Sequence, residues 1–466
     1  MKLKKGNIIK LNIESLSFGG SGFAKYEGAA VFVEKGLPGQ EVEAFIFKKQ
    51  KTYFKAKINN IIKESPHSIN PKCSHFNDCG GCSFQNFDYS EQTKEKYQQV
   101  KDTLEHIGNF KDLKINPITK AKEQFNYRNK MEFTFSNNPW FEKYNPKEKK
   151  DFCIGLHPKG RFDKIIDIQS CEIQSHIANQ IINTVRDIAI ELKIIPYDIK
   201  KHVGFLRQLV IRSADYNNET MVIIVTSKKD HDKLSPIIKE LSKIKEIKSI
   251  INNVNSRKAD VSYSEEQYIL YGEDSITEKL GTYKFKISPD SFFQTNSKQA
   301  KKLYDIIKDE ADLKGDEIVY DLYCGTGTIG IYLSDKAKKI FGFEIIHSAI
   351  DDAIINASNN NVKNALFFQG DIKDSLVNNK EMDIIEKPDI SIIDPPRSGL
   401  HPKALKNIVD LDQKKIIYIS CNPATQARDL KEIVGYGYKI KKIRPLDMFP
   451  HTPHIETVVT LVNERY

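Results

Sequence analysis

Long apolar runs are missing from this chain of 466 residues. No stretch approaches the roughly 18 consecutive apolar residues that a membrane-spanning helix requires. The basic N-terminal segment, MKLKKGNIIK, is followed by neither a continuous apolar stretch nor a small-residue cleavage site. These absences argue against a membrane partner and a secretory signal, and we expect a cytoplasmic protein.

Arginine is scarce, since only 10 of the 71 basic residues are Arg. A lysine-rich surface suits sequence-independent attraction to phosphate better than bidentate reading of bases. The net charge is +9, and residues 1–63 contribute +7 of it through 12 Lys and 5 acidic residues. This concentration is typical of a nucleic-acid-binding module, although a solvated lysine-rich surface explains the charge equally well.

Cysteine is also sparse, and an odd total of seven thiols in a cytosolic chain argues against disulfides. Cys73, Cys79 and Cys82 form the pattern C-x5-C-x2-C, with a Gly-Gly pair that lets the backbone wrap tightly. Thiols at such short spacing predict a metal site, either a tetrahedral zinc or an iron–sulfur cluster. The site needs a fourth ligand, for which Cys171 in KIIDIQSCEIQS is preferred to Cys153.

The chain divides by pattern into three parts. Turn residues and short apolar runs alternate over residues 7–62, and about five strands in this length predict a small barrel of OB type. A Lys-, Glu- and Gln-rich helix is expected at about 90–107, and mixed strands and helices over 125–290 predict an α+β region. From about 297, strands and helices alternate, which predicts a parallel, doubly wound, Rossmann-like sheet.

Ligands in doubly wound sheets bind at the carboxyl ends of the strands, where several motifs of this chain fall. The loop DLYCGTGTIG places Gly325 and Gly327 in a G-x-G-x-x-G pattern between a strand and a helix. This loop alone does not separate a dinucleotide from S-adenosylmethionine. Glu344 ends the next strand, where a carboxylate can bind both ribose hydroxyls, and Asp371 closes the following strand within reach of an adenine amino group.

The next two strands end in chemically distinctive residues. Asp394 precedes two prolines in IIDPPRSGL, a rigid turn typical of methyltransferases that act on planar nitrogenous groups. Cys421 ends the strand of KKIIYISCNPATQARDL, just before a helix that begins at Pro423. A thiol at a helix N-terminus has a lowered pKa, which predicts a nucleophile.

A nucleophilic thiol is required for methylation at C5 of uracil, which is a weak carbon nucleophile. Addition of a thiolate to C6 turns the ring into an enolate with electron density at C5, which then takes the methyl group. A base must afterwards remove the C5 proton so that the thiolate can leave. Glu456, at the start of the final strand in HTPHIETVVTL, is the candidate base.

Five motifs in this order resemble the RNA uracil-C5-methyltransferases: FFQTN (292–296), DLYCGTG, IDPPRSG, SCNPAT and HTPHIETV. The resemblance covers essentially the whole chain. It implies an S-adenosylmethionine-dependent enzyme of RNA with a class I methyltransferase domain. It also implies cofactor contacts from Gln294, Tyr323, Glu344 and Asp394, with Cys421 as nucleophile and Glu456 as base.

Accessory segments refine the expectation. Residues 1–62 resemble the TRAM domain, an OB-like RNA-binding barrel that bacterial enzymes for 23S ribosomal RNA carry, which favours ribosomal RNA as the substrate. Archaeal members of the family carry similar accessory domains, so transfer RNA is an alternative substrate. The cysteine pattern resembles the one that holds a [4Fe-4S] cluster in this family, with Cys73, Cys79, Cys82 and Cys171 as the ligands.

We therefore expect a monomer of three parts: the barrel (1–62), a central cluster-bearing and RNA-binding domain (63–290) whose segment 90–120 packs on the catalytic domain, and the methyltransferase domain (291–466). Two other classes of function are considered. A redox enzyme would use the cluster with a dinucleotide, but the cysteine spacing lacks the compact C-x3-C-x2-C pattern of radical enzymes. A non-catalytic RNA-binding protein would not need the intact set Gln294, Asp394, Cys421 and Glu456.

Overall fold

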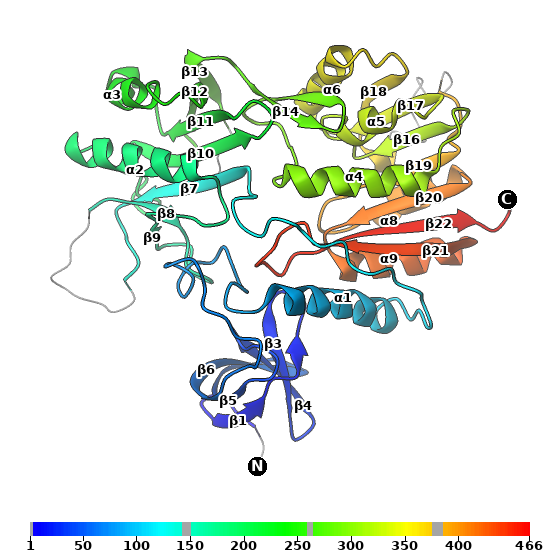
Figure 1. Cartoon of the computed structure of the whole chain (residues 1–466), viewed down its shortest axis with the longest axis horizontal. Helices are drawn as coiled ribbons and strands as arrows, with labels where there is room; N and C mark the ends of the chain where they lie inside the picture. Colours follow the sequence, from blue (N-terminus) through cyan, green and yellow to red (C-terminus); the bar gives the residue numbers. More distant parts are fainter. Residues whose placement is uncertain (1–2, 142–150, 259–263, 375–384) are drawn as a thin grey trace.

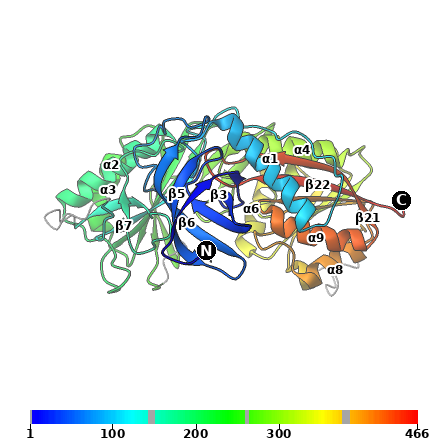
Figure 2. The ribbon, with the colours of Figure 1, turned by 90° about the horizontal axis from the view of Figure 1, so that it is seen from below.

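The computed structural model describes residues 3–141, 151–258, 264–374 and 385–466. Three large sheets organise these residues. The central and C-terminal sheets lie side by side in Figure 1, and the N-terminal sheet lies below them. Helix α1 (Tyr89–His106) crosses between the N-terminal and C-terminal sheets, and Figure 2 shows it running beside the N-terminal sheet.

The N-terminal sheet follows a two-residue alternation of buried and solvent-facing side chains. Its order is β1-β5-β6-β4-β3-β2, in which β1 pairs with β5 and β2 pairs with β3. Between β1 and β2, the amide of Glu14 donates to the carbonyl oxygen of Phe23 at 2.8 Å, so one bent strand curls the sheet on itself. The predicted barrel is confirmed as this curled sheet, which is made of β1 (Ile8–Asn12), β2 (Ser15–Leu16), β3 (Ser21–Tyr26), β4 (Ala29–Glu34), β5 (Glu41–Lys49) and β6 (Tyr53–Lys63).

The inner strands of the central sheet are buried on both faces, and β10 consequently reads as an almost continuous buried run, whereas the edge strand β13 is largely exposed. Leu209 and Ile211 face α2 (His176–Glu191) and α3 (His231–Leu241), whereas Val210 belongs to the core shared with the C-terminal part. The order is β13-β12-β11-β10-β7-β8-β9. Its strands are β7 (Lys130–Ser136), β8 (Cys153–Leu156), β9 (Ile166–Asp167), β10 (Leu206–Ala214), β11 (Glu219–Thr226), β12 (Ile247–Val254) and β13 (Glu266–Gly272).

The C-terminal sheet has the order β18-β17-β16-β19-β20-β22-β21. Its first five strands are parallel, as predicted, whereas β22 is antiparallel to both β20 and β21. The strands are β16 (Ile318–Leu322), β17 (Lys339–Glu344), β18 (Ala365–Gln369), β19 (Ile390–Ile393), β20 (Lys415–Ser420), β21 (Tyr438–Leu446) and β22 (Glu456–Asn463). The closing antiparallel hairpin, which the strand–helix alternation does not predict, reverses the direction of the last strand.

Helices cover both faces of this sheet. One face packs against α4 (Ser297–Ala311), α5 (Thr328–Leu333), α6 (His347–Asn359) and the hairpin of β14 (Ile276–Leu280) and β15 (Tyr283–Ile287). The other face packs against α8 (Pro402–Asp410) and α9 (Pro423–Gly435), together with Val100 and Leu104 of α1. After α1 the chain follows β21, with bridges from Ile115 to Ile443 and from Thr119 to Leu446.

Helix length and polarity bear on the membrane question. Among the described residues, no helix combines the length and the apolar character needed to cross a membrane.

Close packing beside β9 makes Gly155 of β8 sensitive to substitution, because a Cβ atom there would lie 1.9 Å from the carbonyl oxygen of Ile166. Gly155→Ala should therefore lower the free energy of unfolding by about 1–3 kcal/mol, the usual cost of overpacking. Gly435→Ala is the matched control, since nothing lies within 4 Å of its Cβ position. Urea unfolding followed by circular dichroism makes the comparison. Equal stability of the two variants would contradict the register of β8 against β9.

Candidate active site and metal centre

The candidate residues of the catalytic part meet at one edge of the C-terminal sheet. Parallel strands end on the same side, which places Tyr323, Glu344, Asp371, Asp394 and Cys421 at or just beyond the carboxyl ends of β16, β17, β18, β19 and β20. Because β22 is antiparallel to β20, its first residue lies at this same edge, with Thr457 directly opposite Ser420. The strand reversal is thus what brings Glu456 to the thiol.

The Gly-rich loop is held by its own packing. The amide of Gly325 donates to Glu344 Oε2 at 3.2 Å, and the amide of Gly330 donates to Asp321 Oδ2 at 2.8 Å. Gly327 has a φ of +73°, and a Cβ atom there would lie 2.7 Å from the ring of Phe367. Glycine at 327 is therefore required both for the backbone conformation and for the space.

The two predicted cofactor acids of β17 and β18 differ in their surroundings. Glu344 Oε1 accepts from the amides of Ile345 and Ile346 at 2.8 and 3.0 Å, which fixes the carboxylate at the strand end. Asp371 pairs with Lys373 at 2.8 Å, and the hydrogen bond from this lysine lowers the pKa of the carboxyl group. Both carboxyl groups are therefore positioned at the edge of the sheet.

Three other carboxyl groups at this edge are desolvated. Burial raises the pKa of Asp321 to about 7, and among the described residues its Oδ1 has no hydrogen-bond partner. Burial also raises the pKa of Asp394 to about 7. The pKa of Glu456 is raised well above its usual value by burial first and by the charge of Asp394 second. Buried carboxyl groups of this kind ionise more readily when a cation lies beside them, so the edge favours a cationic ligand.

The position of Cys421 agrees with the prediction, but its predicted pKa is wrong. Asn422 caps α9 by accepting from the amide of Ala424 at 3.1 Å, so the thiol does precede a helix N-terminus. Burial nevertheless raises the pKa of Cys421 to about 11, and the charges of Glu456 and Asp394 act in the same direction. The free enzyme therefore keeps this thiol protonated at neutral pH.

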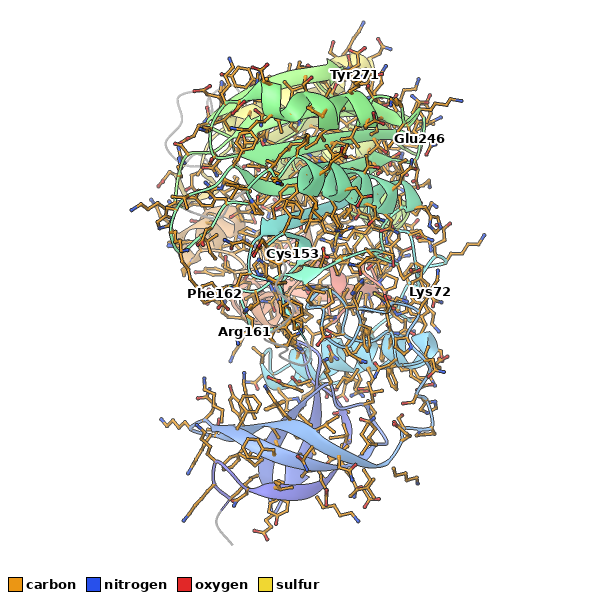
Figure 3. The ribbon with its side chains drawn as sticks, turned by 90° about the vertical axis from the view of Figure 1, so that its left-hand side faces the viewer. Lys72, Cys153, Arg161, Phe162, Glu246 and Tyr271 are labelled. Atoms are coloured by element: carbon orange, nitrogen blue, oxygen red, sulfur yellow. The ribbon has the colours of Figure 1, made fainter. Side chains whose placement is uncertain are left out.

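A cavity of about 870 Å³ lies over the central sheet and reaches the segment before α4 and His454, although neither Cys421 nor Glu456 lines it. Five cationic side chains and one acid line it, and Phe162 and Phe292 at its wall are 77% and 66% exposed. Figure 3 shows Arg161 and Phe162 on the face between the central sheet and the N-terminal sheet. The cavity reaches His454 at one side and Gly80 and Gly81 of the cysteine loop at the other; its charged residues are Arg128, Lys130, Glu132, Lys159, Arg161 and Arg212.

The four predicted metal ligands line a second, small cavity of about 20 Å³. Burial raises the pKa of Cys79 to about 11 and of Cys82 to about 12, and each of the two thiols is destabilised as an anion by the other cysteines. Cys73 and Cys171 complete the set. Within the described part of the chain, however, no three His, Cys, Asp or Glu side chains converge closely enough to hold a single metal ion.

Polar contacts support the cysteine loop. The amide of Gly81 donates to Cys79 Sγ and Gln85 Nε2 donates to Cys82 Sγ, both at 3.3 Å. A Cβ atom at Gly80 would lie 2.9 Å from the carbonyl oxygen of His157, so the predicted tight wrapping has its cause at this glycine.

Sequence reasoning missed two residues at this edge. Asp321 is buried inside β16, and its signal is a lone acid in the apolar strand IVYDL. His454 lines the large cavity, and burial lowers its pKa to about 4, so the ring is neutral at physiological pH. His454 lies two residues before Glu456, in a segment whose sequence predicts a role for the glutamate alone.

A doubly wound sheet with a Gly-rich loop, strand-end acids and Asp-Pro-Pro at the same edge defines a methyltransferase. The chain belongs to the RNA (uracil-5-)-methyltransferase family, since the family described as tRNA (Uracil-5-)-methyltransferase matches residues 88–464. A TRAM domain matches residues 2–58. The chain is thus an S-adenosylmethionine-dependent enzyme that methylates uracil C5 in RNA.

Individual proteins agree with the family. Uncharacterized RNA methyltransferases of Chlorobaculum tepidum and Clostridium tetani are 38% and 39% identical to this chain, covering 98% and 99% of it and 97% and 99% of their own lengths. A tRNA (uracil-54, C5)-methyltransferase of Pyrococcus abyssi, solved with S-adenosyl-L-homocysteine, is 31% identical with a TM-score of 0.76. The structural match covers 97% of this chain and 99% of that protein.

The raised pKa of Cys421 predicts slow and strongly pH-dependent alkylation. Its thiolate fraction at pH 7 should be about 100-fold below that of a thiol with the ordinary pKa of 9.0, because the pKa is about 11. Iodoacetamide labelling of the ligand-free enzyme, followed by mass spectrometry of the Cys421 peptide, should speed up about tenfold per pH unit up to pH 10. A plateau below pH 8 would show instead that the helix N-terminus dominates.

Proposed function

We propose that this enzyme forms 5-methyluridine in RNA through a transient bond between Cys421 Sγ and C6 of the target uracil. The observation that supports the proposal most strongly is the juxtaposition of Cys421 and Glu456. They come from adjacent antiparallel strands at the cofactor edge, and their charges act on each other. A thiol beside a desolvated carboxyl group suits addition to a ring carbon followed by removal of a proton.

The proposed reaction balances as follows. The Cys421 thiol first gives its proton to solvent when the cationic cofactor beside it favours the ionised form. The thiolate then adds to C6, and C5 takes a methyl group from the sulfonium of S-adenosylmethionine, leaving S-adenosylhomocysteine. Glu456 then removes the C5 proton, the C6–S bond breaks, and the thiolate is restored. Once a cation beside it favours its ionised form, a carboxyl group whose pKa is raised by burial is a stronger base for this proton than an exposed carboxylate.

For the cofactor we propose contacts from the strand-end residues and from the segment before α4. Glu344, held by backbone amides, would bind the ribose hydroxyls, and Asp394 would face the cationic end of the molecule. The backbone of the segment before α4 is fixed by Asn129, whose Nδ2 donates to the carbonyl oxygen of Gln294 at 3.0 Å. The full proposed set is Gln294, Tyr323, Gly325, Gly327, Glu344, Asp371 and Asp394.

For the RNA we propose the large cavity as the path of the target strand. Cations attract phosphates, and exposed aromatic rings such as Phe162 provide stacking surfaces for unpaired bases. A row of half-buried rings also crosses the N-terminal sheet, with centroids 5.7 Å apart for Phe23 and Phe32 and 5.1 Å apart for Phe32 and Tyr53. The target uridine must leave its stack to reach the thiol, which favours a loop nucleotide.

Two RNA substrates are candidates. The TRAM domain favours 23S ribosomal RNA by resemblance. The Pyrococcus abyssi relative is named for transfer RNA, yet its match covers 97% of this chain and so includes most of the barrel. The barrel therefore does not separate the two substrates by itself. Incubation with labelled S-adenosylmethionine and unmodified 23S ribosomal RNA or transfer RNA, followed by mapping of the label, decides between them.

We also propose a [4Fe-4S] cluster on Cys73, Cys79, Cys82 and Cys171. A zinc ion needs all four sulfurs about 2.3 Å from one point, whereas a cluster binds each sulfur at a different iron and tolerates wider spacing. Four thiols that line one cavity without converging on a single-ion site fit the cluster better. The N–H groups of Gly81 and Gln85 already donate to two of the sulfurs. The proposed role is structural, because methyl transfer moves no electrons to or from the protein.

The base assignment is tested by Glu456→Gln, which should accumulate an RNA–protein adduct that survives denaturation, because methylation proceeds but elimination stalls. Cys421→Ala should abolish turnover and the adduct while S-adenosylmethionine still binds. Denaturing gel electrophoresis with labelled RNA measures both. Normal turnover of Glu456→Gln would disprove the role of this residue, and an active Cys421→Ala would disprove the covalent route.

The cluster assignment is tested by Cys79→Ser, which should remove the absorption near 400 nm and the bound iron of anaerobically purified protein. Cys153→Ser is the matched control, because Cys153 donates to the carbonyl oxygen of Ser136 in β7 and should leave both signals intact. Iron, sulfide and zinc analyses read the result. A colourless wild-type protein that carries one zinc would refute the cluster.

A further inference from the structure

The loop between β21 and β22, residues 447–455, is held at an unusual number of points. Five successive carbonyl oxygens, from Asp447 to His451, each accept a hydrogen bond from a donor outside the loop. The donors are, in order, Gln299 Nε2 at 2.7 Å, Asn296 Nδ2 at 2.8 Å, Lys96 Nζ at 3.1 Å, the Tyr127 hydroxyl at 2.9 Å, and the amides of Ser83 and Phe84 at 2.8 and 3.0 Å. This loop, which we call the anchored loop, leads directly into Glu456.

Helix α1 contributes a buried ion pair and a hydrogen bond to the side chain of Asp447 in this loop. Lys96 Nζ lies 2.5 Å from Asp447 Oδ1, and the two side chains are 1% and 0% exposed. The Tyr89 hydroxyl donates to the other oxygen of Asp447 at 2.7 Å and accepts from the amide of Ala121 at 2.8 Å. Breaking a buried pair of this kind leaves an uncompensated charge.

Gln92 of the same helix face joins the anchored loop to the cysteine segment. Its Oε1 accepts from the amide of His451 at 3.0 Å, and its Nε2 donates to the carbonyl oxygens of Phe84 and Phe87 at 2.8 and 2.7 Å. His451 has a φ of +63°, a conformation that a non-glycine residue keeps only when its surroundings hold it. Gln92 is fully buried and supplies one of these restraints.

The anchored loop ends at groups that face the substrate. His454 of this loop lines the large cavity, and Glu456 follows two residues later as the last pair of the β21–β22 ladder, opposite Leu446. Beyond that pair no strand continues, so the position of the loop backbone is set by its anchors rather than by the sheet.

We infer that Gln92 and Lys96 of α1 are positioning residues for methyl transfer, acting through the anchored loop on His454 and Glu456. Neither side chain reaches the reacting atoms. They hold the backbone from which the proton-removing side of the site projects, and Gln92 ties that backbone to the residues that follow Cys82. The inference rests on the proposed role of Glu456 as the base.

Gln92→Leu removes the hydrogen bonds and keeps most of the volume. We expect kcat to fall about 10- to 100-fold, the usual result of an ångström-scale misplacement. S-adenosylmethionine affinity, measured by calorimetry, should stay within about twofold. The fraction of enzyme in the denaturation-resistant RNA adduct at steady state should rise above wild type, because elimination is slowed more than addition.

Two variants on the same helix serve as matched controls. Gln98→Leu changes an exposed residue that bonds only to Asp102, and it should match wild type. Gln99→Leu removes the bond to the carbonyl oxygen of Leu16 in the barrel and leaves the anchored loop untouched. If Gln92→Leu has the kcat of Gln98→Leu, or loses activity and cofactor binding in parallel without adduct, the inference is wrong.

A milder variant keeps the test decisive should Gln92→Leu fail to fold. Tyr89→Phe removes one hydroxyl group from Asp447 and should show the same changes in smaller degree. Glu456→Gln is run alongside both variants. Adduct from Glu456→Gln but from neither α1 variant refutes the positioning role alone. If Glu456→Gln turns over normally, the assignment of Glu456 as the base has failed. The positioning role of α1 is then tested by comparing kcat with S-adenosylmethionine affinity in the α1 variants. A parallel loss of both quantities refutes that role.

Discussion

The burial of carboxyl groups at one sheet edge is the constraint on which the catalytic part depends. Burial raises the pKa values of Asp321 and Asp394 to about 7 and raises the pKa of Glu456 well above its usual value. Burial also raises the pKa of Cys421, so its thiol stays protonated. Such a site is poorly satisfied until a cation enters it, and the methyl donor of this enzyme family carries one on its sulfur. Because a nearby positive charge favours the ionised forms of both thiol and carboxyl groups, cofactor binding and nucleophile activation are coupled by electrostatics. A thiol that stays protonated in the free enzyme is also less reactive toward alkylation and oxidation there.

The reversal of the last strand places a buried carboxyl group beside the thiol. Parallel strands alone would deliver the cofactor acids and Cys421 to one edge, but a sixth parallel strand would begin at the opposite edge. The antiparallel pairing of β22 with β20 places the first residue of β22 beside the last residues of β20. The proposed nucleophile and the proposed base are thus neighbours across two hydrogen-bonded strands, and their spacing is set by a ladder rather than by flexible loops. The ladder does not fix the backbone just before Glu456. Hydrogen bonds from outside the loop to residues 447–451 fix it instead.

Local patterns predicted the parts of this arrangement that local rules control. Strand–helix alternation was enough to place Glu344, Asp394 and Cys421 together, because parallel connectivity brings strand ends to one side whatever the packing. The pKa of Cys421 was mispredicted because burial depends on elements far away in sequence, and here it outweighs the helix N-terminus. The roles of Gln92 and Lys96 could not be predicted either, since their partners lie 359 and 351 residues away, and a helix rich in Lys, Glu and Gln reads as a solvated surface.

Helix α1 contacts the anchored loop with one face and the barrel with the other, and so connects the barrel to the active site. The face toward the anchored loop carries a buried ion pair, whereas among the described residues the face toward the barrel makes two hydrogen bonds, from Leu16 to Glu95 at 2.6 Å and from Gln99 to Leu16 at 3.1 Å. The barrel also touches the anchored loop itself, since a Cβ atom at Gly20 would lie 3.2 Å from both Pro453 and the ring of Phe84. Phe84 and Phe87 in turn pack with Leu16 and Leu37 of the barrel, and Gln92 holds their carbonyl oxygens. The barrel is therefore connected to the proposed proton-removing side of the site through these few residues, since the anchored loop and Phe84 both contact it and Gln92 bonds to both.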